Sequence, residues 1–274
     1  MKSLRLTVVT PSFNQAAYVE ATLLSVLNQD YRNTEYIVID GGSTDGSVTT
    51  IAKYSDKLAY WCSEPDRGQA DAIAKGFERA TGDVYCWINS DDLLLPGALT
   101  SVARHFTSHP KASVLTGGAY AIDCTGTHVR GFGTLTRGIS ATYDRFRFYG
   151  QDNVFQPATF WRREAYEAAG GIDRSLQFIM DYDLFTRLAR RSTFSVVPDF
   201  LAAFRLHDAS KSATLQHLRR QECLKFARRY GVDRYSPRTR CFLYWWYRIP
   251  ALARKLCWRV QRECGLLCLP GATA

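Results

Sequence analysis

The chain has 274 residues, of which 46% are apolar and 22% are charged. This length is enough for one large α/β domain with an appendage, and the composition is that of a folded globular protein rather than a disordered chain. No run of 18 or more apolar residues occurs, and the first strand pattern lacks the apolar stretch and cleavage site of a secretory signal. We therefore expect a cytoplasmic protein without a membrane-spanning helix.

The positive charge is concentrated at the C-terminal end. Residues 215–274 hold thirteen Lys and Arg residues against three acidic ones, whereas residues 1–214 hold the remaining 22 basic and 23 acidic residues. A near-neutral body with a cationic attachment, in a chain without a nucleic-acid-binding motif, predicts no nucleic-acid partner. We therefore divide the chain into a body, residues 1–214, and a basic, aromatic helical extension, residues 215–274.

Strand and helix patterns alternate along the first hundred residues. Buried apolar runs predict strands at Leu4–Thr10, Glu35–Ile39, Leu58–Cys62 and Val84–Ile88. Amphipathic spacing and capping residues predict helices at Tyr18–Gln29, Gly46–Tyr54, Gln69–Ala80 and Gly97–Phe106. Alternation of this kind with short connections predicts parallel βαβ units in one sheet that carries helices on both faces.

The pattern is looser in the rest of the body. Further strands are predicted at Val114–Tyr120, Val129–Phe132, Pro157–Trp161, Phe194–Val197 and Leu201–Leu206. Two more helices are predicted at Arg163–Ala169 and Tyr182–Arg191. The sequence therefore predicts the α/β class for the whole body.

Polar clusters follow the first four predicted strands directly. In open α/β sheets, ligands bind outside the carboxyl ends of the strands. Because parallel strands end at one edge of the sheet, we expect the four clusters to share one ligand site: Pro11–Asn14, Asp40–Ser43, Glu64–Arg67 and Asn89–Asp92.

The last of these clusters contains two adjacent carboxylates, Asp91 and Asp92. Holding two carboxylates together at a strand end is costly unless a positive charge joins them. Mg²⁺ or Mn²⁺ is a suitable partner, because it takes one or two carboxylates together with phosphate oxygens of a substrate. Alternatively, one of the two residues caps the helix predicted after Pro96.

Three other polar residues are candidates for the site, and two of them also have a structural interpretation. Asp40 ends a strand and is placed to hydrogen-bond a nucleobase or ribose, but it also suits a tight turn. Arg67 offers a fork for phosphate, but it also suits a solvated ion pair. Asp181 is a candidate general base at the start of a helix.

Taken in order, five motifs resemble those of the family 2 inverting glycosyltransferases, which have the GT-A fold. The resemblance covers roughly residues 4–212 and rests on Thr10–Gln15, Asp40–Gly46, Glu64–Gln69, Asn89–Asp92 and Asp181–Leu184. It implies an α/β body with a nucleotide-diphospho-sugar transferase fold, in which a Rossmann-like mixed sheet is flanked by helices and followed by a C-terminal helical tail.

The resemblance also implies where a nucleotide-sugar donor binds. Pro11 and Phe13 would lie along the nucleobase, and Asp40 would hydrogen-bond it. The remaining donor-binding residues line the nucleotide pocket or belong to the D-x-D-type motif: Asp66, Arg67, Asn89, Ser90 and Asp91.

The cation and the base follow from the same resemblance. Asp91 would be the ligand of Mn²⁺ or Mg²⁺, with His207 near the cation or the diphosphate, and Asp181 would be the catalytic base. Two positions depart from the family pattern: Asn89 replaces the first acidic residue of the D-x-D-type motif, and Met180 stands where many members have Glu. These departures affect the ligand set and the orientation of the base.

The predicted reaction moves a sugar from a nucleotide-diphosphate-sugar donor to an acceptor hydroxyl. A cation neutralises the departing diphosphate, and Asp181 accepts the proton of the attacking hydroxyl. A single displacement inverts the anomeric carbon. The resemblance places such an enzyme in the assembly of bacterial surface polysaccharide or glycolipid.

Two other classes of function remain open at this point. A sugar nucleotidyltransferase also needs strand-end carboxylates and a metal, but it releases pyrophosphate rather than a nucleoside diphosphate. The other class is a non-catalytic scaffold that binds a membrane or a nucleic acid.

The extension mixes cations with aromatic residues over residues 238–262, and Pro250 is expected to divide it into two helices. Basic faces beside Trp and Tyr suit an interfacial helix on an anionic membrane. Such contact would place the protein on the inner face of the plasma membrane, close to a lipid-linked saccharide acceptor. Packing on the body and dimerisation are the alternatives.

Overall fold

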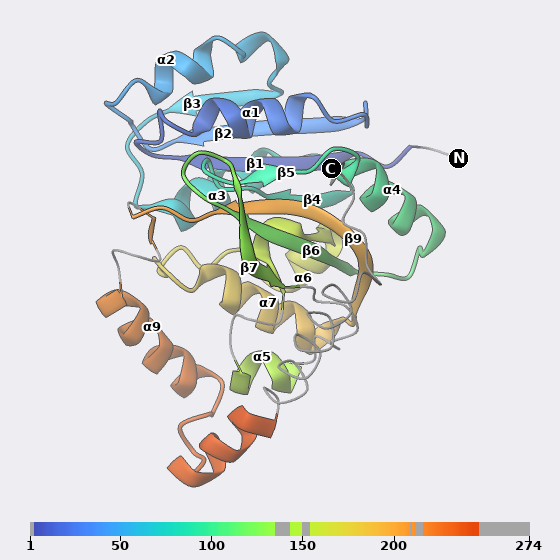
Figure 1. Ribbon diagram of the computed structural model, residues 1–274. Coiled ribbons are helices and arrows are strands. Elements are labelled where there is room, and N and C mark those ends of the chain that lie inside the picture. The colour runs from blue at the N-terminus through green and yellow to red at the C-terminus, as the bar shows by residue number, and fades with distance from the viewer. Residues whose placement is uncertain (1–2, 135–142, 150–153, 209, 212–215, 247–274) are drawn as a thin grey trace.

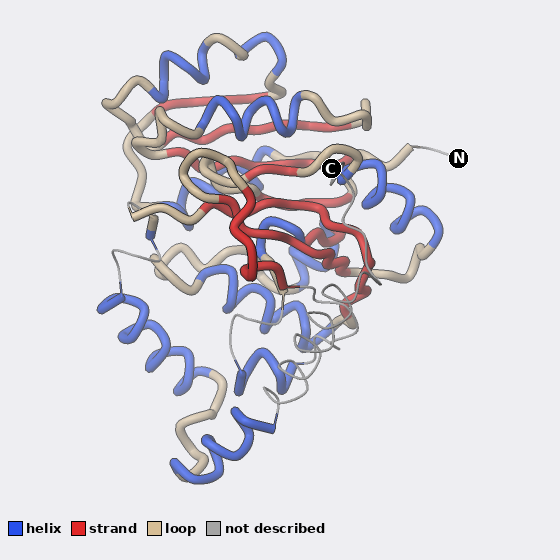
Figure 2. Tube along the Cα trace, viewed as in Figure 1, coloured by secondary structure: helices blue, strands red, loops and turns tan. Residues whose placement is uncertain are grey.

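A single mixed sheet forms the centre of the molecule, and helices cover both of its faces (Figure 1; Figure 2). The computed structural model describes residues 3–134, 143–149, 154–208, 210–211 and 216–246. The strand order is β3-β2-β1-β4-β8-β6-β9-β5, with β7 paired to β6. The predicted mixed sheet flanked by helices is therefore confirmed.

The first half of the sheet is parallel. Its strands are β1 (Leu6–Ser12), β2 (Thr34–Asp40), β3 (Tyr60–Ser63) and β4 (Val84–Trp87). The helices that connect or follow them are α1 (Val19–Leu27), α2 (Ser47–Ala52), α3 (Gln69–Arg79) and α4 (Ala98–Ser108). These elements match the predicted ones apart from small shifts at their ends.

The register of these strands brings their carboxyl ends to one edge. Ser12 of β1 pairs with Asp40 of β2, and Asp40 pairs with Ser63 of β3. On the other side of β1, Val9 pairs with Trp87, the last residue of β4. The four polar clusters therefore emerge from the same edge, as the sequence predicted.

The second half of the sheet is mixed. β8 (Thr159–Arg162) is antiparallel to β4, and the sheet continues through β6 (Val114–Ile122) to the long strand β9 (Phe194–Arg205). Two short additions are β5 (Leu93–Leu94), which pairs with β9, and β7 (His128–Thr134), which pairs with β6.

The strand β9 replaces two strands predicted from the sequence. Its pairing with β6 is interrupted between Thr116 and Gly118, where the register shifts, and then resumes. Pro198 lies in the shifted stretch of β9, where a residue without an N–H group is tolerated. The register shift interrupts the pairing without ending the strand. For this reason the sequence pattern predicted two separate strands here.

Alternate side chains of the central strands enter two different cores. Val8 and Val38 belong to the cluster that packs against α1, α2 and α4. Val9 and Ile37 belong to the other cluster, which also contains Trp87 of β4, Trp161 of β8 and Phe185 of α7. This alternation follows from the two-residue period of a strand and explains why both faces of the sheet are covered.

The second core is covered by helices that come from distant parts of the chain. They are α3, α5 (Tyr143–Tyr149), α6 (Arg163–Ala168), α7 (Met180–Arg191) and α9 (Gln216–Arg229). The helix α5 lies in a stretch for which no element was predicted. Figure 1 shows α9 and the helix over residues 237–246 on the side of α5 and α7.

The start of the extension packs on the body. The ring of Phe226 on α9 stacks on that of Tyr182 on α7 at a centroid distance of 4.3 Å. Arg229 Nη1 lies 3.0 Å from Asp183 Oδ1 in the same pair of helices. The predicted helical tail is thus confirmed for α9 and for the helix over residues 237–246. The helix α9 packs on the body, which is one of the alternatives that the sequence left open.

Other parts of the extension lie outside the described residues. These are residues 212–215, which include the predicted domain boundary, and residues 247–274, which include Pro250. Within the described ranges, no helix is both long and apolar enough to cross a lipid bilayer.

Candidate active site

A cleft of about 970 Å³ opens at the carboxyl edge of the parallel strands. One wall is formed by residues at and after the ends of β1, β2, β3 and β4. The other wall includes residues at the start of α7 and just before it: Gln177, Phe178, Met180 and Asp181. Seven of the predicted site residues line this cleft: Pro11, Phe13, Asp66, Asn89, Ser90, Asp91 and Asp181.

The loop after β1 presents an exposed aromatic ring. Phe13 is 60% exposed, which is unusual for a phenylalanine and leaves its face open to the cleft. The next residue, Asn14, has a left-handed φ of 51°. Its side-chain oxygen accepts a hydrogen bond from the N–H of Thr44 at 2.9 Å, and its own N–H donates to Ser43 Oγ at 2.8 Å. These bonds fix the loop that carries Phe13.

Asp40 differs from the prediction that it contacts a nucleobase. Its side chain is fully buried and does not line the cleft. The carboxylate accepts hydrogen bonds from the N–H groups of Gly42 and Ser43 and from the hydroxyls of Ser43 and Ser63. Four bonds use the acceptor capacity of a carboxylate. Asp40 therefore shapes the turn after β2, and Gly41 lines the cleft in its place.

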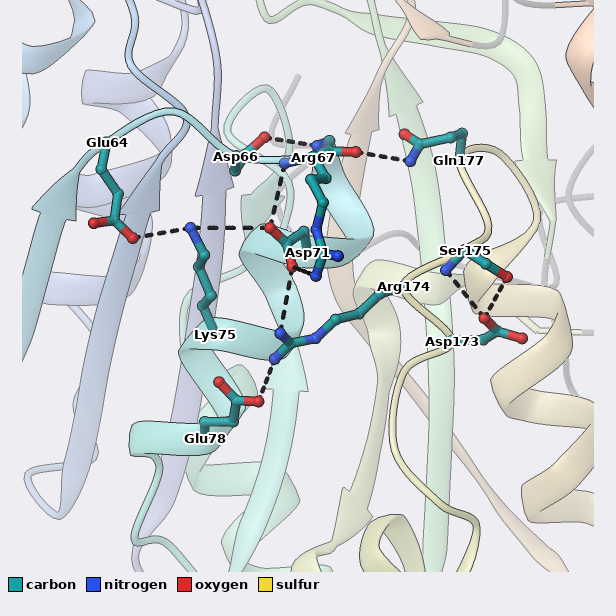
Figure 3. Close-up of polar contacts among 11 residues, drawn as sticks. Glu64, Asp66, Arg67, Asp71, Lys75, Glu78, Asp173, Arg174, Ser175 and Gln177 are labelled. Atoms are coloured by element: carbon teal, nitrogen blue, oxygen red, sulfur yellow. Dashed lines mark hydrogen bonds and ion pairs between the residues drawn. The ribbon is translucent and has the colours of Figure 1, made fainter.

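Asp66 and Arg67 point in different directions (Figure 3). Asp66 lines the cleft, and its Oδ1 accepts a hydrogen bond from the N–H of Gly68 at 2.7 Å. The side chain of Arg67 is 73% exposed and lies 3.1 Å from the buried carboxylate of Asp71, to which Arg174 is also paired. The structure therefore corrects the predicted position of Arg67, whose guanidinium belongs to an ion-pair network outside the cleft lining.

Asn89 occupies a position where a carboxylate would be unfavourable. Its Nδ2 donates to Asp92 Oδ2 at 3.0 Å, and its Oδ1 accepts from Gln69 Nε2 at 2.7 Å. Burial, together with the neighbouring Asp91, raises the pKa of Asp92 well above its usual range. A carboxylate at position 89 would lack the amide N–H that donates to Asp92 Oδ2 and would add a further negative charge beside Asp91 and Asp92. The amide is therefore the physical partner of a buried Asp92.

Asp92 lines the cleft as well, but its side chain serves the fold and does not cap a helix. Its Oδ1 accepts a hydrogen bond from the N–H of Arg205 at 2.9 Å, which fastens the end of β9 to the loop after β4. The helix α4 begins after Gly97 without a side-chain capping bond. Asp91 and Asp92 both line the cleft, but the two oxygens of Asp92 accept hydrogen bonds from Arg205 and Asn89, so Asp91 is the better candidate of the pair for holding a cation.

Asp91 and His207 lie together although they are far apart in the chain. His207 Nε2 is 3.0 Å from Asp91 Oδ2, and the His207 ring packs on Tyr18 at a centroid distance of 4.7 Å. The separation is that of a hydrogen bond between the two side chains, of which Asp91 alone lines the cleft among the described residues of this pair; two ligands at right angles on one octahedral Mg²⁺ or Mn²⁺ ion would also lie about 3 Å apart. The described residues contain no group of three or more His, Cys, Asp or Glu side chains placed to hold a metal ion. The protein would thus supply two ligands and leave the others to phosphate oxygens and water.

Asp181 lies on the facing wall, at the start of α7. Burial raises the pKa of its carboxyl to about 6, and Oδ1 accepts a hydrogen bond from the N–H of Tyr182 at 2.8 Å. Nearby, burial lowers the pKa of Lys211 to about 8. The Lys211 ammonium donates to Gln69 Oε1 at 2.9 Å and to the carbonyl of Gln177 at 2.6 Å, and so connects the two walls. A carboxylate that titrates near neutrality suits proton abstraction.

Glu222 on α9 holds the segment that carries Asp181. Its buried carboxylate accepts hydrogen bonds from the N–H groups of Gln177, Phe178 and Ile179 at 2.6, 2.9 and 3.0 Å. These groups precede α7 and have no partner within that helix. The sequence analysis missed Glu222 because no motif surrounds it. It assigned no role to Gln69 or Lys211 either, and these pairings join distant parts of the chain.

Comparison with known proteins agrees with the motifs. The family model described as glycosyl transferase family 2 matches residues 7–170. An uncharacterized glycosyltransferase of Rickettsia typhi is 26% identical over 220 residues, which cover 79% of this chain and 69% of that protein. An uncharacterized glycosyltransferase of Mycobacterium tuberculosis is 43% identical over 86 residues, which cover 31% of this chain and 33% of that protein.

Solved glycosyltransferase structures share the fold. Residues 1–349 of S. aureus TarS, solved with UDP-GlcNAc, match with a TM-score of 0.62 and 19% identity over 77% of this chain and 61% of that one. The mannosyltransferase PcManGT of Pyrobaculum calidifontis, solved with GDP-Man and Mn²⁺, matches with a TM-score of 0.63 and 19% identity over 99% of this chain and 78% of that one. These similarities confirm the predicted GT-A fold.

Proposed function

We propose that this chain, which belongs to glycosyl transferase family 2, moves a sugar from a nucleotide-diphosphate-sugar donor to an acceptor hydroxyl. The observation that carries the proposal is the single cleft that Asp91 and Asp181 both line, with His207 paired to Asp91. The complexes of TarS with UDP-GlcNAc and of PcManGT with GDP-Man support the same class of donor.

The sheet wall of the cleft would bind the donor. The exposed ring of Phe13 offers a surface for a nucleobase, and Pro11 and Asp66 lie beside it. Asp91 and His207 would hold Mn²⁺ or Mg²⁺, which when bound neutralises the charge of a diphosphate leaving group. The Mn²⁺ ion of PcManGT supports this assignment.

Asp181 would act as the base on the facing wall. Its pKa of about 6 keeps it ionised at neutral pH, yet basic enough to accept the proton of an attacking hydroxyl. The ammonium of Lys211 stabilises this ionised form. One displacement of this kind inverts the anomeric carbon and leaves no sugar bound covalently to the protein.

The acceptor is proposed to be a lipid-linked saccharide in surface polysaccharide or glycolipid assembly. Support comes from the helix over residues 237–246, where Phe242, Trp245 and Trp246 are 61%, 47% and 62% exposed. Aromatic rings beside basic residues suit the interface of an anionic membrane. The protein would then act in the cytoplasm as a peripheral protein on the inner face of the plasma membrane.

Nucleotide binding and product release test this function. UDP, GDP and dTDP would be screened for thermal stabilisation with and without Mn²⁺, and one of them should raise Tm only when the cation is present. Incubation with the matching nucleotide sugar and an acceptor should release the nucleoside diphosphate. Release of pyrophosphate would instead identify a sugar nucleotidyltransferase, and stabilisation by none of the three nucleotides would exclude the proposed donor class.

A further inference from the structure

A second cavity, of about 680 Å³, lies among helices that do not build the sheet wall of the cleft. None of its described lining residues is acidic, and none of them also lines the cleft. We call this cavity the arginine pocket, because five guanidinium groups line it: Arg147, Arg187, Arg190, Arg229 and Arg234.

The arginines come from three helices and one turn. The helices α5, α7 and α9 gather on the side of the molecule away from β1 and β2 (Figure 1). After α9 the chain reverses at Gly231, whose φ of 67° is left-handed, and the N–H of Val232 donates to the carbonyl of Ala227 at 2.8 Å. This reversal brings Arg234 and Tyr235 to the pocket.

The described carboxylates around the pocket do not balance its cations. Asp183, which is buried, lies 2.8 Å from Arg187 Nε and 3.0 Å from Arg229 Nη1. Asp173 and Asp144 each pair with one arginine as well, at 2.8 Å from Arg229 and 3.4 Å from Arg147. Five guanidinium groups thus meet three carboxylates.

Two cations of the pocket remain without an ion pair among the described side chains. They are Arg190 and Arg234, which are both exposed. In addition, Arg187 Nη2 is a buried atom that has no hydrogen-bond partner in the described part of the chain. A concave site with excess guanidinium charge concentrates anions, and paired guanidinium forks match the oxygens of a phosphate.

We propose that the arginine pocket binds a phosphate or diphosphate group at a site separate from the donor cleft. The rise of an α-helix puts Arg190 about 13 Å along α7 from Asp181, so the two sites lie toward opposite ends of one helix. The proposal does not depend on sugar transfer. Its ligand is either a soluble anion or the phosphate of a lipid head group, since the helix with exposed Trp245 and Trp246 follows Tyr235 closely.

Chemical modification of the unaltered protein tests the site directly. Phenylglyoxal, which reacts with guanidinium groups, would be applied with and without pyrophosphate in EDTA, and the modified residues read by peptide mass spectrometry. Arg190 and Arg234 should react several-fold more slowly with pyrophosphate present. Arg191 and Arg228, which are exposed on the same helices but do not line the pocket, provide the control and should not change.

Matched double variants give a second measurement. Pyrophosphate affinity in EDTA should fall at least about tenfold in R190Q/R234Q but less than about twofold in R191Q/R228Q, which loses the same net charge. Equal losses of pyrophosphate affinity in both variants, or equal protection of all four arginines from phenylglyoxal, would show that the positive surface attracts the anion without a defined site. Either result would overturn the proposal.

Vesicles distinguish the two sources of phosphate. The modification experiment would be repeated with phosphatidylcholine vesicles that contain or lack phosphatidic acid. Protection of Arg190 and Arg234 by phosphatidic acid identifies a head-group site, whereas protection by pyrophosphate alone identifies a site for a soluble anion. Protection by neither ligand would refute the proposal, and it would leave the nucleotide-dependent stabilisation of the cleft unaffected.

Discussion

The two walls of the cleft are built in different ways. The sheet wall follows the ends of parallel strands: a ladder of backbone bonds includes Pro11, and Asn89 and Asp91 follow within four residues of Trp87, where the pairing of β1 with β4 ends. The helix wall carries Asp181 on a segment whose N–H groups are held by one carboxylate, Glu222, from another helix. The sheet wall is therefore secured by many bonds, and the helix wall depends on few. Substitutions on the two walls should separate donor binding from proton transfer.

Apart from substitution of Asp181 itself, the largest effect is expected on the sheet wall from D91N. Loss of the carboxylate removes one of two protein ligands proposed for the cation, which should lower transfer about a hundredfold or more. The Mn²⁺-dependent rise of Tm with nucleoside diphosphate should disappear as well. D56N, which removes an exposed carboxylate far from the cleft, serves as the control and should behave as wild type.

The pH dependence of turnover probes the helix wall. A base acts only when deprotonated, and the pKa of Asp181 is raised to about 6, so kcat should fall as the pH falls through about 6. The loss should approach about tenfold for each further pH unit. The K211M substitution removes the Lys211 ammonium, whose charge lowers the pKa of Asp181. In this variant the fall of kcat should therefore begin at a higher pH. If kcat fell only near pH 4, about the usual pKa of an aspartic acid, in both the wild type and K211M, Asp181 would be excluded as the titrating base.

E222Q tests whether α9 positions the base. The amide replaces a carboxylate that accepts three backbone N–H bonds, so unfolding should become about 1–3 kcal/mol easier and kcat should fall up to about tenfold. Nucleotide affinity should stay near wild type, because the sheet wall is untouched. E164Q on α6, an exposed glutamate, is the matched control. A parallel loss of nucleotide affinity would show that the two walls are not separable.

The smallest effect is expected from R67Q. The Arg67 guanidinium pairs with Asp71 outside the cleft, so nucleotide affinity measured by titration should change less than about twofold. D66N, which alters the neighbouring residue that does line the cleft, should weaken binding more. A large loss in R67Q would restore the prediction made from the sequence and would require Arg67 to turn toward the donor.

The sheet wall was largely predictable because its signals are local. A buried run followed by polar residues marks the end of a strand, and parallel pairing brings such ends together. The direction of each side chain was not predictable in the same way. Asp40 is fully buried among donors of its own turn, and Arg67 turns to a carboxylate four residues away, although both belong to the right loops.

The helix wall and the arginine pocket were not predictable because they depend on pairs far apart in the chain. Glu222 meets residues 177–179, and His207 meets Asp91, only after the sheet and the helices have assembled. The family resemblance supplied Asp181 and His207 without showing what holds them. The helix α5, which contributes Arg147 to the pocket, had no recognisable signal in the sequence.

D181N tests the central claim most directly, because it asks whether the two walls form one active site with divided roles. Transfer and the Mn²⁺-dependent stabilisation by nucleoside diphosphate would be measured on the same preparation. The claim predicts a fall in kcat of about 10² to 10⁴ while the stabilisation remains that of wild type. Near-native turnover, or loss of transfer together with loss of nucleotide binding, would contradict it.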